Sequence, residues 1–370
     1  MFSLEADTAL PLWKGRYWDN RVAPSTIPTR RPSGKQRSGT NLCPVVGRTT
    51  RHNHLRNIAK LHLPMVFTRA RQSGSGMLCV TLLTFLLLTP ELRSQGSNSP
   101  QVSAAELVRL TVAHEMDSAN DESHKHLFRS RKQVPRGSQT RLYVETNDAM
   151  AGMTIAYNDQ PLDPQQQKAE QDHLVWLANN PEQLRKKRAR EKADEERTLR
   201  ILRALPQAFL YEYDGTETGE AAVGKTGDVL RRLKFTPNPS YSPPTRVEQV
   251  LTGMQGYLLI DTAVHRLARI EGTLFRDVTF GWGIIGHLDR GGYFRIQQAD
   301  IGDGSWQITS MNVKVTGKVL LFRGLSIITN EVFSDFHPVP SNLTFAKAVE
   351  LLRAEQEKLG RGSVTSLVQN

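Results

Sequence analysis

The chain has little cysteine and no long apolar run. Its 2 cysteines, Cys43 and Cys79, both precede the part of the chain that shows strand patterning. A region without a thiol cannot contain a structural disulfide, a cysteine nucleophile or a cysteine-based zinc site. These three kinds of chemistry are therefore excluded from residue 96 onward.

The longest apolar run covers residues 77–88. Arg69 and Arg71 precede it, and Pro90 and small polar residues follow it. A membrane-spanning helix needs about 20 apolar residues, whereas a basic segment followed by a short apolar core is typical of a secretory signal peptide. We expect a signal peptide over 77–95 and a periplasmic or secreted mature protein. An uncleaved membrane anchor is the alternative.

Positive charge is concentrated before this signal. Residues 1–76 hold 13 of the 48 lysines and arginines but 3 of the 37 aspartates and glutamates. They show no helical or strand periodicity, so we expect a disordered leader or a segment upstream of the true translation start. The rest of the chain carries 35 basic and 34 acidic residues. The net charge of +11 therefore gives no reason to expect nucleic acid as a partner.

Short alternating segments dominate the second half of the chain. Across 256–337 they follow one another through turns with almost no helical periodicity, which predicts an antiparallel sheet. The fold class expected is α+β: a curled antiparallel β-sheet forming an open half-barrel. We expect this β domain to span 100–338 and to be interrupted by a helical insertion at 163–205.

Three helical regions complete the predicted fold. Ser103 and Glu106 form a capping box that begins an N-terminal helix. Asn180 and Pro181 separate two helices inside the insertion, because asparagine is a good N-cap and proline fits the first helical position. An apolar stripe predicts a C-terminal helix within 339–370, which can close over the sheet.

Two glycine-rich segments match nucleotide-binding patterns. Residues 219–226 match a P-loop letter for letter, and 281–286 match the dinucleotide fingerprint. A P-loop requires a strand just before its first glycine and a helix just after its threonine. Neither segment has that context, so we expect a surface loop and a strand with glycines, and no cofactor. A nucleotide-binding enzyme that uses 219–226 is the alternative.

The histidines do not predict a metal site. His124 and His126 would share one face of a strand, but no third ligand is suitably spaced. No nucleophile elbow or assignable carboxylate pair is present either. We therefore expect no metal, no catalytic residue and no enzymatic activity.

Apolar residues that alternate along two predicted strands form the candidate ligand-binding surface. A sheet with one apolar face must cover that face with helices or offer it to a ligand. Ordinary core is the alternative role for these residues. The candidate lining residues are Val278, Phe280, Trp282 and Ile284 on one predicted strand, and Met311, Val313 and Val315 on the other.

The second predicted helix of the insertion is densely charged over 182–200. Pairs such as Lys187 and Glu191 are four residues apart and can stabilise a helix in water. Acidic residues are mixed with the basic ones, which favours a solvated surface over a nucleic-acid or lipid site. A structural or docking role, with an envelope protein binding this helix, is a further hypothesis.

Several hairpin sequences resemble a known family. These are residues 158–162 (NDQPL), 256–261 (GYLLID), 266–271 (RLARIE) and 334–336 (SDF). In these residues the chain is similar to periplasmic proteins related to the outer-membrane lipoprotein-sorting carriers, over about residues 100–338. The resemblance implies a half-barrel whose apolar concave face holds a lipid or a lipoprotein acyl chain without catalysis. The long charged helix departs from the carrier pattern.

Overall fold

The computed structural model describes residues 102–281, 285–319 and 323–368. The helices are α1 (Ala104–Ala119), α2 (Pro164–Ala178), α3 (Pro181–Ala208), α4 (Arg246–Gln249), followed by a 3₁₀ turn (Val250–Gly253), and α5 (Phe345–Val368). The strands are β1 (Lys125–Val134), β2 (Gly137–Val144), β3 (Ala151–Tyr157), β4 (Gln160–Pro161), β5 (Phe209–Thr218), β6 (Val229–Pro237), β7 (Met254–Asp261), β8 (Arg266–Leu274), β9 (Val278–Phe280), β10 (Gly286–Leu288), β11 (Tyr293–Asp300), β12 (Trp306–Val319) and β13 (Arg323–Val339).

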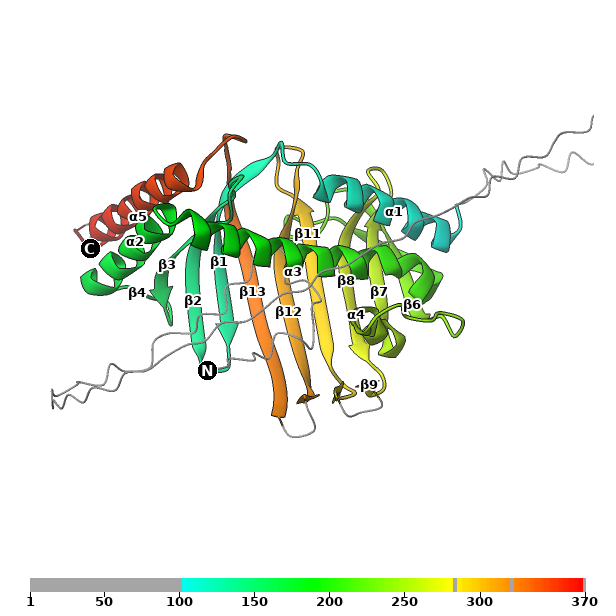
Figure 1. Ribbon diagram of the computed structural model, residues 1–370. Helices are drawn as coiled ribbons and strands as arrows, with labels where there is room; N and C mark the ends of the chain where they lie inside the picture. The colour runs from blue at the N-terminus through cyan, green and yellow to red at the C-terminus, as the bar shows by residue number, and fades with distance from the viewer. Residues whose placement is uncertain (1–101, 282–284, 320–322, 369–370) are drawn as a thin grey trace, which may run out of the picture. The chain divides into compact units, whose positions relative to one another are not determined.

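The strands form one antiparallel sheet that does not close. Its order is β4-β3-β2-β1-β13-β12-β11-β8-β7-β6-β5, and β10 joins through β12 and pairs with β9. β4 and β5 are the two edges, and helices lie at both ends of the described region (Figure 1). The predicted α+β class with an open antiparallel sheet is therefore confirmed.

Local sequence explains where the helices begin. The Ser103 side chain accepts a hydrogen bond from the Glu106 N–H at 3.2 Å and starts α1. Asp163 caps α2 through a complete capping box with Gln166. The predicted joint within the insertion is also confirmed, because α2 ends before Asn180 and α3 begins at Pro181.

Positive backbone angles fix the tight turn before the insertion. Asn158 and Asp159 have φ angles of 49° and 62°, and they connect Tyr157 to its register partner Gln160. A two-residue turn with both φ angles positive matches the twist of a β-hairpin, and asparagine and aspartate tolerate this conformation well. The short edge strand β4 and the start of α2 follow directly from this turn.

One predicted strand is wrong. The sequence predicted a single strand over 278–284, but β9 ends at Phe280 and β10 returns antiparallel from Gly286. Gly281 has a φ angle of 55°, a conformation that glycine adopts without strain. The apolar alternation over 278–284 therefore did not reveal that the strand ends at Phe280.

Each face of the sheet has its own covering helices. Consecutive strand residues point to opposite faces, so Leu127 and Phe128 belong to different apolar clusters. The cluster of Phe128 lies on what we call the inner face, and α1, the end of α3 and the 3₁₀ turn cover it. The cluster of Leu127 lies on the outer face, and α2 and α5 cover it. No helix within the described ranges is long and apolar enough to cross a membrane.

A buried ion pair holds α1 to the sheet. Arg266, at the start of β8, donates from Nε to Glu115 Oε1 at 2.9 Å and from Nη2 to Oε2 at 3.2 Å. The same carboxylate accepts the Leu267 N–H at 2.8 Å, and Ser118 Oγ accepts from Arg266 Nη1. Both charged side chains are almost fully buried. A buried carboxylate with this many donors fixes the angle at which the helix packs.

Removing Glu115 should leave the Arg266 charge buried and unpaired. We expect Glu115→Ala to lower the free energy of unfolding by about 3 kcal/mol, measured by urea unfolding. Glu106→Ala, which removes an exposed ion pair with Arg109 on the same helix, is the matched control and should change stability little. Equal losses in the two variants would contradict an anchoring role for Glu115.

Candidate ligand-binding face

The predicted lining residues that fall in the described ranges come together in one cluster on the inner face. They are Val278, Phe280, Met311, Val313 and Val315. All are buried except Val313, which is half-buried. The other two predicted lining residues, Trp282 and Ile284, lie outside the described residues. The sequence therefore grouped residues from β9 and β12 that do share one apolar surface.

Polarity changes along this surface. β12 and β13 pair directly, so opposed residues of the two strands share a face. From one end to the other, the opposed pairs are Val315 with Ile327, Val313 with Thr329, and Met311 with Glu331. Along these three pairs the face changes from apolar residues to a carboxyl group, and the buried Phe333 of the same cluster follows at the next inner-face position of β13.

The apolar end is not fully sealed by the protein. Val313, Val319, Ile327 and Ile285 pack against the inner cluster but are only half-buried. Apolar side chains that line an interior and still contact solvent lose part of the free energy that full burial would provide, about 25 cal/mol per Å² of exposed apolar area. This end is where an apolar ligand would gain most by binding.

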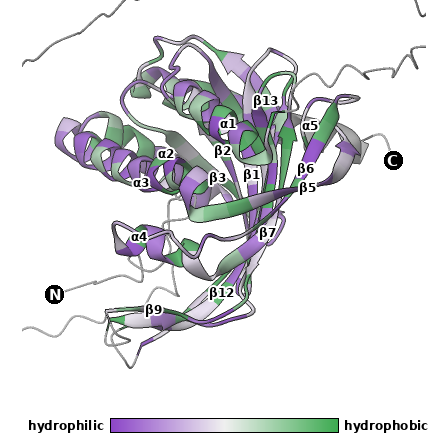
Figure 2. Ribbon diagram, turned by 90° about the vertical axis from the view of Figure 1, so that its right-hand side faces the viewer, coloured by the Kyte–Doolittle hydropathy of each residue, from purple (hydrophilic) through white to green (hydrophobic). Residues whose placement is uncertain are grey.

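The helix that crosses the inner face covers it with charge. Figure 1 shows α3 running in front of the middle strands, and Figure 2 shows it coloured mainly as hydrophilic. Its buried residues all lie in its last eight positions: Ile201, Leu202, Leu205 and Ala208. Before them, the half-buried positions are mostly polar and include Lys187, Glu191, Asp194 and Thr198, with Leu184 and Leu199 among the few apolar ones. Glu191 accepts the Met150 N–H at 3.1 Å.

This arrangement makes α3 an unusual cover. A helix that packs permanently on an apolar sheet normally turns an apolar stripe toward it. Over most of its length α3 is instead polar and charged, and all of its buried side chains lie in its last turns. In the N-terminal part of α3, Leu184 packs against the outer cluster and is only half-buried, so this part has less hydrophobic packing than the end of the helix.

A first polar cluster on the inner face centres on Glu331. Its side chain is 1% exposed, and Ser130 Oγ donates to Oε1 at 2.5 Å. Lys132 and Arg141 project from the adjacent strands β1 and β2, and both act on this carboxyl group electrostatically. Burial raises the pKa of Glu331, and the two cations and Ser130 only partly offset that effect.

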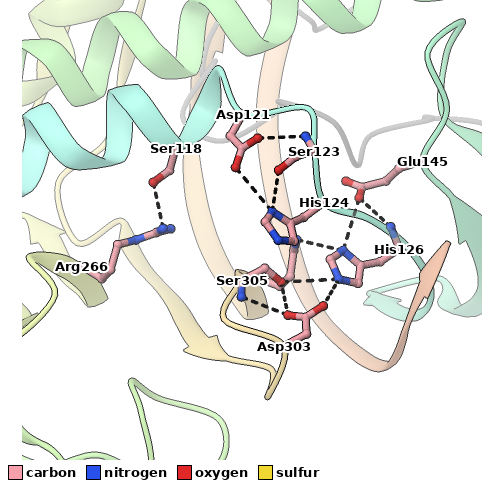
Figure 3. Close-up of polar contacts among 10 residues, drawn as sticks. Ser118, Asp121, Ser123, His124, His126, Glu145, Arg266, Asp303 and Ser305 are labelled. Carbon is pink, nitrogen blue, oxygen red and sulfur yellow. Dashed lines mark hydrogen bonds and ion pairs between the residues drawn. The ribbon is translucent and has the colours of Figure 1, made fainter. Parts of the chain in front are cut away.

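A second polar cluster surrounds His126 (Figure 3). His126 is 1% exposed on β1, and its Nε2 lies 2.8 Å from Asp303 Oδ2 in the turn between β11 and β12. Its Nδ1 lies 3.6 Å from Glu145 Oε2, and its backbone N–H donates to the same oxygen at 3.0 Å. Since β13 lies between β1 and β12, the imidazole bridges over a strand to hold that turn.

The charges of this cluster support one another. Burial lowers the pKa of His126, but the carboxylates of Glu145 and Asp303 outweigh it and the pKa is raised. Burial raises the pKa of Asp303, but its bonds to His126 and Ser305 dominate and bring it to about 2. His124, predicted to share a face with His126, is instead half-exposed beside Asp121. Within the described ranges, no group of three or more His, Cys, Asp or Glu side chains could hold a metal ion.

The P-loop-like segment 219–226 is a loop between two antiparallel strands, β5 and β6. Its Gly219 N–H donates to Asp228 O and its Gly224 N–H to Gln298 O, each at 2.8 Å. Thr309 Oγ1 also donates to Ala222 O at 2.6 Å. Backbone N–H groups that would cradle a phosphate in a P-loop are thus used within the protein. No helix follows Thr226, and the loop instead packs on the sheet.

Sequence analysis missed the two polar clusters because their members are far apart in the chain. Glu331 and Ser130 are separated by 201 positions, and His126 and Asp303 by 177. One signal could have found Glu331: a charged residue at an inward position of an alternating strand. His126 gave no comparable signal, because its partner lies in a turn.

Comparisons with known proteins add one structural match. No family model matches the chain, and no curated protein matches it. Among solved structures, the chain is similar to a proposed outer membrane lipoprotein-sorting protein domain from Vibrio parahaemolyticus, with a TM-score of 0.24 and 13% identity. The match covers 66% of this chain and 97% of that one.

Stability should depend on pH through His126. Because its pKa is raised on folding, the protonated ring stabilises the protein fully below its ordinary pKa of 6.5, and this contribution is lost as pH rises through the raised pKa. Ionised Asp303 stabilises the folded protein fully above its ordinary pKa of 3.8, and this stabilisation is lost as pH falls toward its lowered pKa of about 2. The free-energy difference between wild type and His126→Gln should therefore be largest between these two ordinary pKa values.

The measurement is urea unfolding across a pH series from about 4 to 9. His124→Gln is the control, since that side chain is half-exposed two residues earlier, and its difference from wild type should stay small and flat. If the free energy of unfolding of wild type minus that of His126→Gln instead grows as pH rises, the predicted direction of the pH dependence is wrong.

Proposed function

We propose that this protein binds an apolar chain, from a lipid or a lipoprotein, on its inner face and carries it in the periplasm without catalysing a reaction. The observation that carries the proposal is the mismatch between the two surfaces that meet there. The sheet offers an apolar surface with half-buried side chains, whereas α3, which runs in front of it (Figure 1), has buried side chains only in its last eight positions. A protein that needed only a stable core would place apolar residues on both sides.

The ligand would take the place of the missing apolar cover. An acyl chain lying along Val313, Val319 and Ile327 would remove from water the side chains that the protein leaves half-buried. Each methylene group buried contributes about 0.8 kcal/mol. A chain of ordinary acyl length therefore provides enough free energy to displace part of α3 from its polar contacts.

The hinge for such a movement lies at the end of α3. Its last turns are fixed by Ile201, Leu202 and Leu205 in the core and by the Tyr211 hydroxyl donating to Leu205 O at 2.8 Å. The N-terminal part lacks buried side chains. The resemblance of residues 100–338 to lipoprotein-sorting carriers supports the same ligand class.

The charged helix also presents a basic outer surface. Arg185, Arg188 and Lys192 are exposed at helical spacing, away from the inward stripe. Their placement favours an anionic partner, and we propose that an envelope protein docks here when the ligand is passed on.

A charge on the apolar end should weaken ligand binding. We expect Val313→Glu to reduce the affinity for a fluorescent fatty-acid probe by on the order of tenfold or more, because a carboxylate would have to be desolvated beside the acyl chain. The readout is a fluorescence titration of the folded protein.

Lys314→Glu is the matched control. It introduces the same side chain one residue later on β12, where the position is exposed and faces away from Val313. Its affinity for the probe should stay close to that of wild type. If wild type does not bind the probe, or if both variants bind it as wild type does, the inner face does not hold acyl chains.

A further inference from the structure

The inner face has a buried carboxyl oxygen without a partner. Glu331 Oε1 accepts from Ser130, but Oε2 has no hydrogen-bond partner among the described residues, although the side chain is 1% exposed. A buried polar atom left unsatisfied costs about 1–3 kcal/mol, and more when it is charged. Such a cost is rarely maintained unless the group meets something in the working protein.

The position of this oxygen relates it to the ligand face. Glu331 lies directly opposite Met311, so it is the next inner-face position after the Val315–Ile327 and Val313–Thr329 pairs. A chain bound on the apolar end and extended along β12 and β13 would bring its polar end to this carboxyl group. The pairing register of β12 and β13, and not a loop, fixes the distance between the Val315–Ile327 pair and Glu331.

The surroundings of Glu331 specify the chemistry of that polar end. In its ionised form a carboxylate oxygen only accepts hydrogen bonds, so the group that satisfies ionised Glu331 Oε2 is an N–H or O–H donor. Lys132 lies opposite Glu331 on β1, and Arg141 follows on β2. These cations favour a negative group beside the donor. One head group that satisfies both is a primary ammonium next to a phosphate or carboxylate.

We propose that Glu331 is the head-group site of the ligand, and that the ligand is an amphiphile whose polar end carries a primary ammonium beside an anion. The ammonium would donate to Glu331 Oε2 while the anion lies toward Lys132 and Arg141. This inference rests on the proposed function, since it places the head of the chain that the inner face holds. Two sources share the chemistry: an ethanolamine phospholipid and a lipopeptide with a free amine.

The test compares lipids that differ only in the head group. Full-length protein is incubated with vesicles of phosphatidylethanolamine, phosphatidylcholine or phosphatidylglycerol with identical acyl chains, and retained lipid is counted by mass spectrometry. Choline keeps the positive charge but has no N–H donor, and glycerol has no cation. We expect wild type to retain the ethanolamine lipid on the order of tenfold better than the choline lipid, the value of one hydrogen bond to a charged group.

Variants assign the preference to Glu331. Glu331→Gln keeps the shape and an acceptor oxygen but loses the charge, so the preference should fall severalfold. Glu331→Met should abolish it while the acyl chain still binds. Asn330→Met, at the exposed position next to Glu331 on β13 that faces away from the inner face, is the control and should keep the full preference. If Glu331→Met does not fold, the Gln variant alone decides.

The outcomes separate this inference from the proposed function. Equal retention of all three lipids by wild type, or a preference that survives Glu331→Gln, overturns the head-group site while acyl-chain binding stands. No retention of any lipid overturns the proposed function and this inference with it. A diacylated peptide with a free or acetylated amine identifies the source: preference for the free amine over the ethanolamine lipid assigns a lipopeptide, and the reverse assigns a phospholipid.

Discussion

The whole arrangement depends on keeping one apolar face of an open sheet away from water. A closed barrel would shield that face by itself, but this sheet ends at β4 and β5, so other elements must cover it. α1 is fixed over part of the face by the Glu115–Arg266 pair, and the last turns of α3 supply apolar packing. The remaining part of α3 lies over the face with polar side chains. In the proposed function, the boundary between the firmly packed and the weakly packed parts of this cover is where a ligand enters.

The two buried polar clusters have different consequences for the sheet. His126, Glu145 and Asp303 satisfy one another, and they bind the β11–β12 turn to β1 across an intervening strand. A satisfied cluster of this kind stabilises one arrangement of the sheet. Glu331 leaves one oxygen unsatisfied at the end of the apolar surface. The first cluster therefore supports the frame, whereas the second is suited to recognition.

Much of the fold could be predicted from the sequence because its determinants are local. Ser103, Asp159 and the Asn180–Pro181 joint each act within a few residues, and alternation marked most of the strands. Prediction failed at Gly281, where apolar alternation continued across a hairpin turn. The site was predictable only in part: Met311 and Val315 follow from alternation on one strand, but the register that sets Met311 opposite Glu331 joins distant segments and has no local pattern.

The central claim is that the inner face holds an acyl chain. The most direct measurement is native mass spectrometry of the protein purified without detergent from an envelope extract. The account predicts a species heavier than the polypeptide by the mass of a phospholipid or an acylated peptide, released when organic solvent is added. A spectrum containing the bare polypeptide alone, from protein that remains folded, would contradict it.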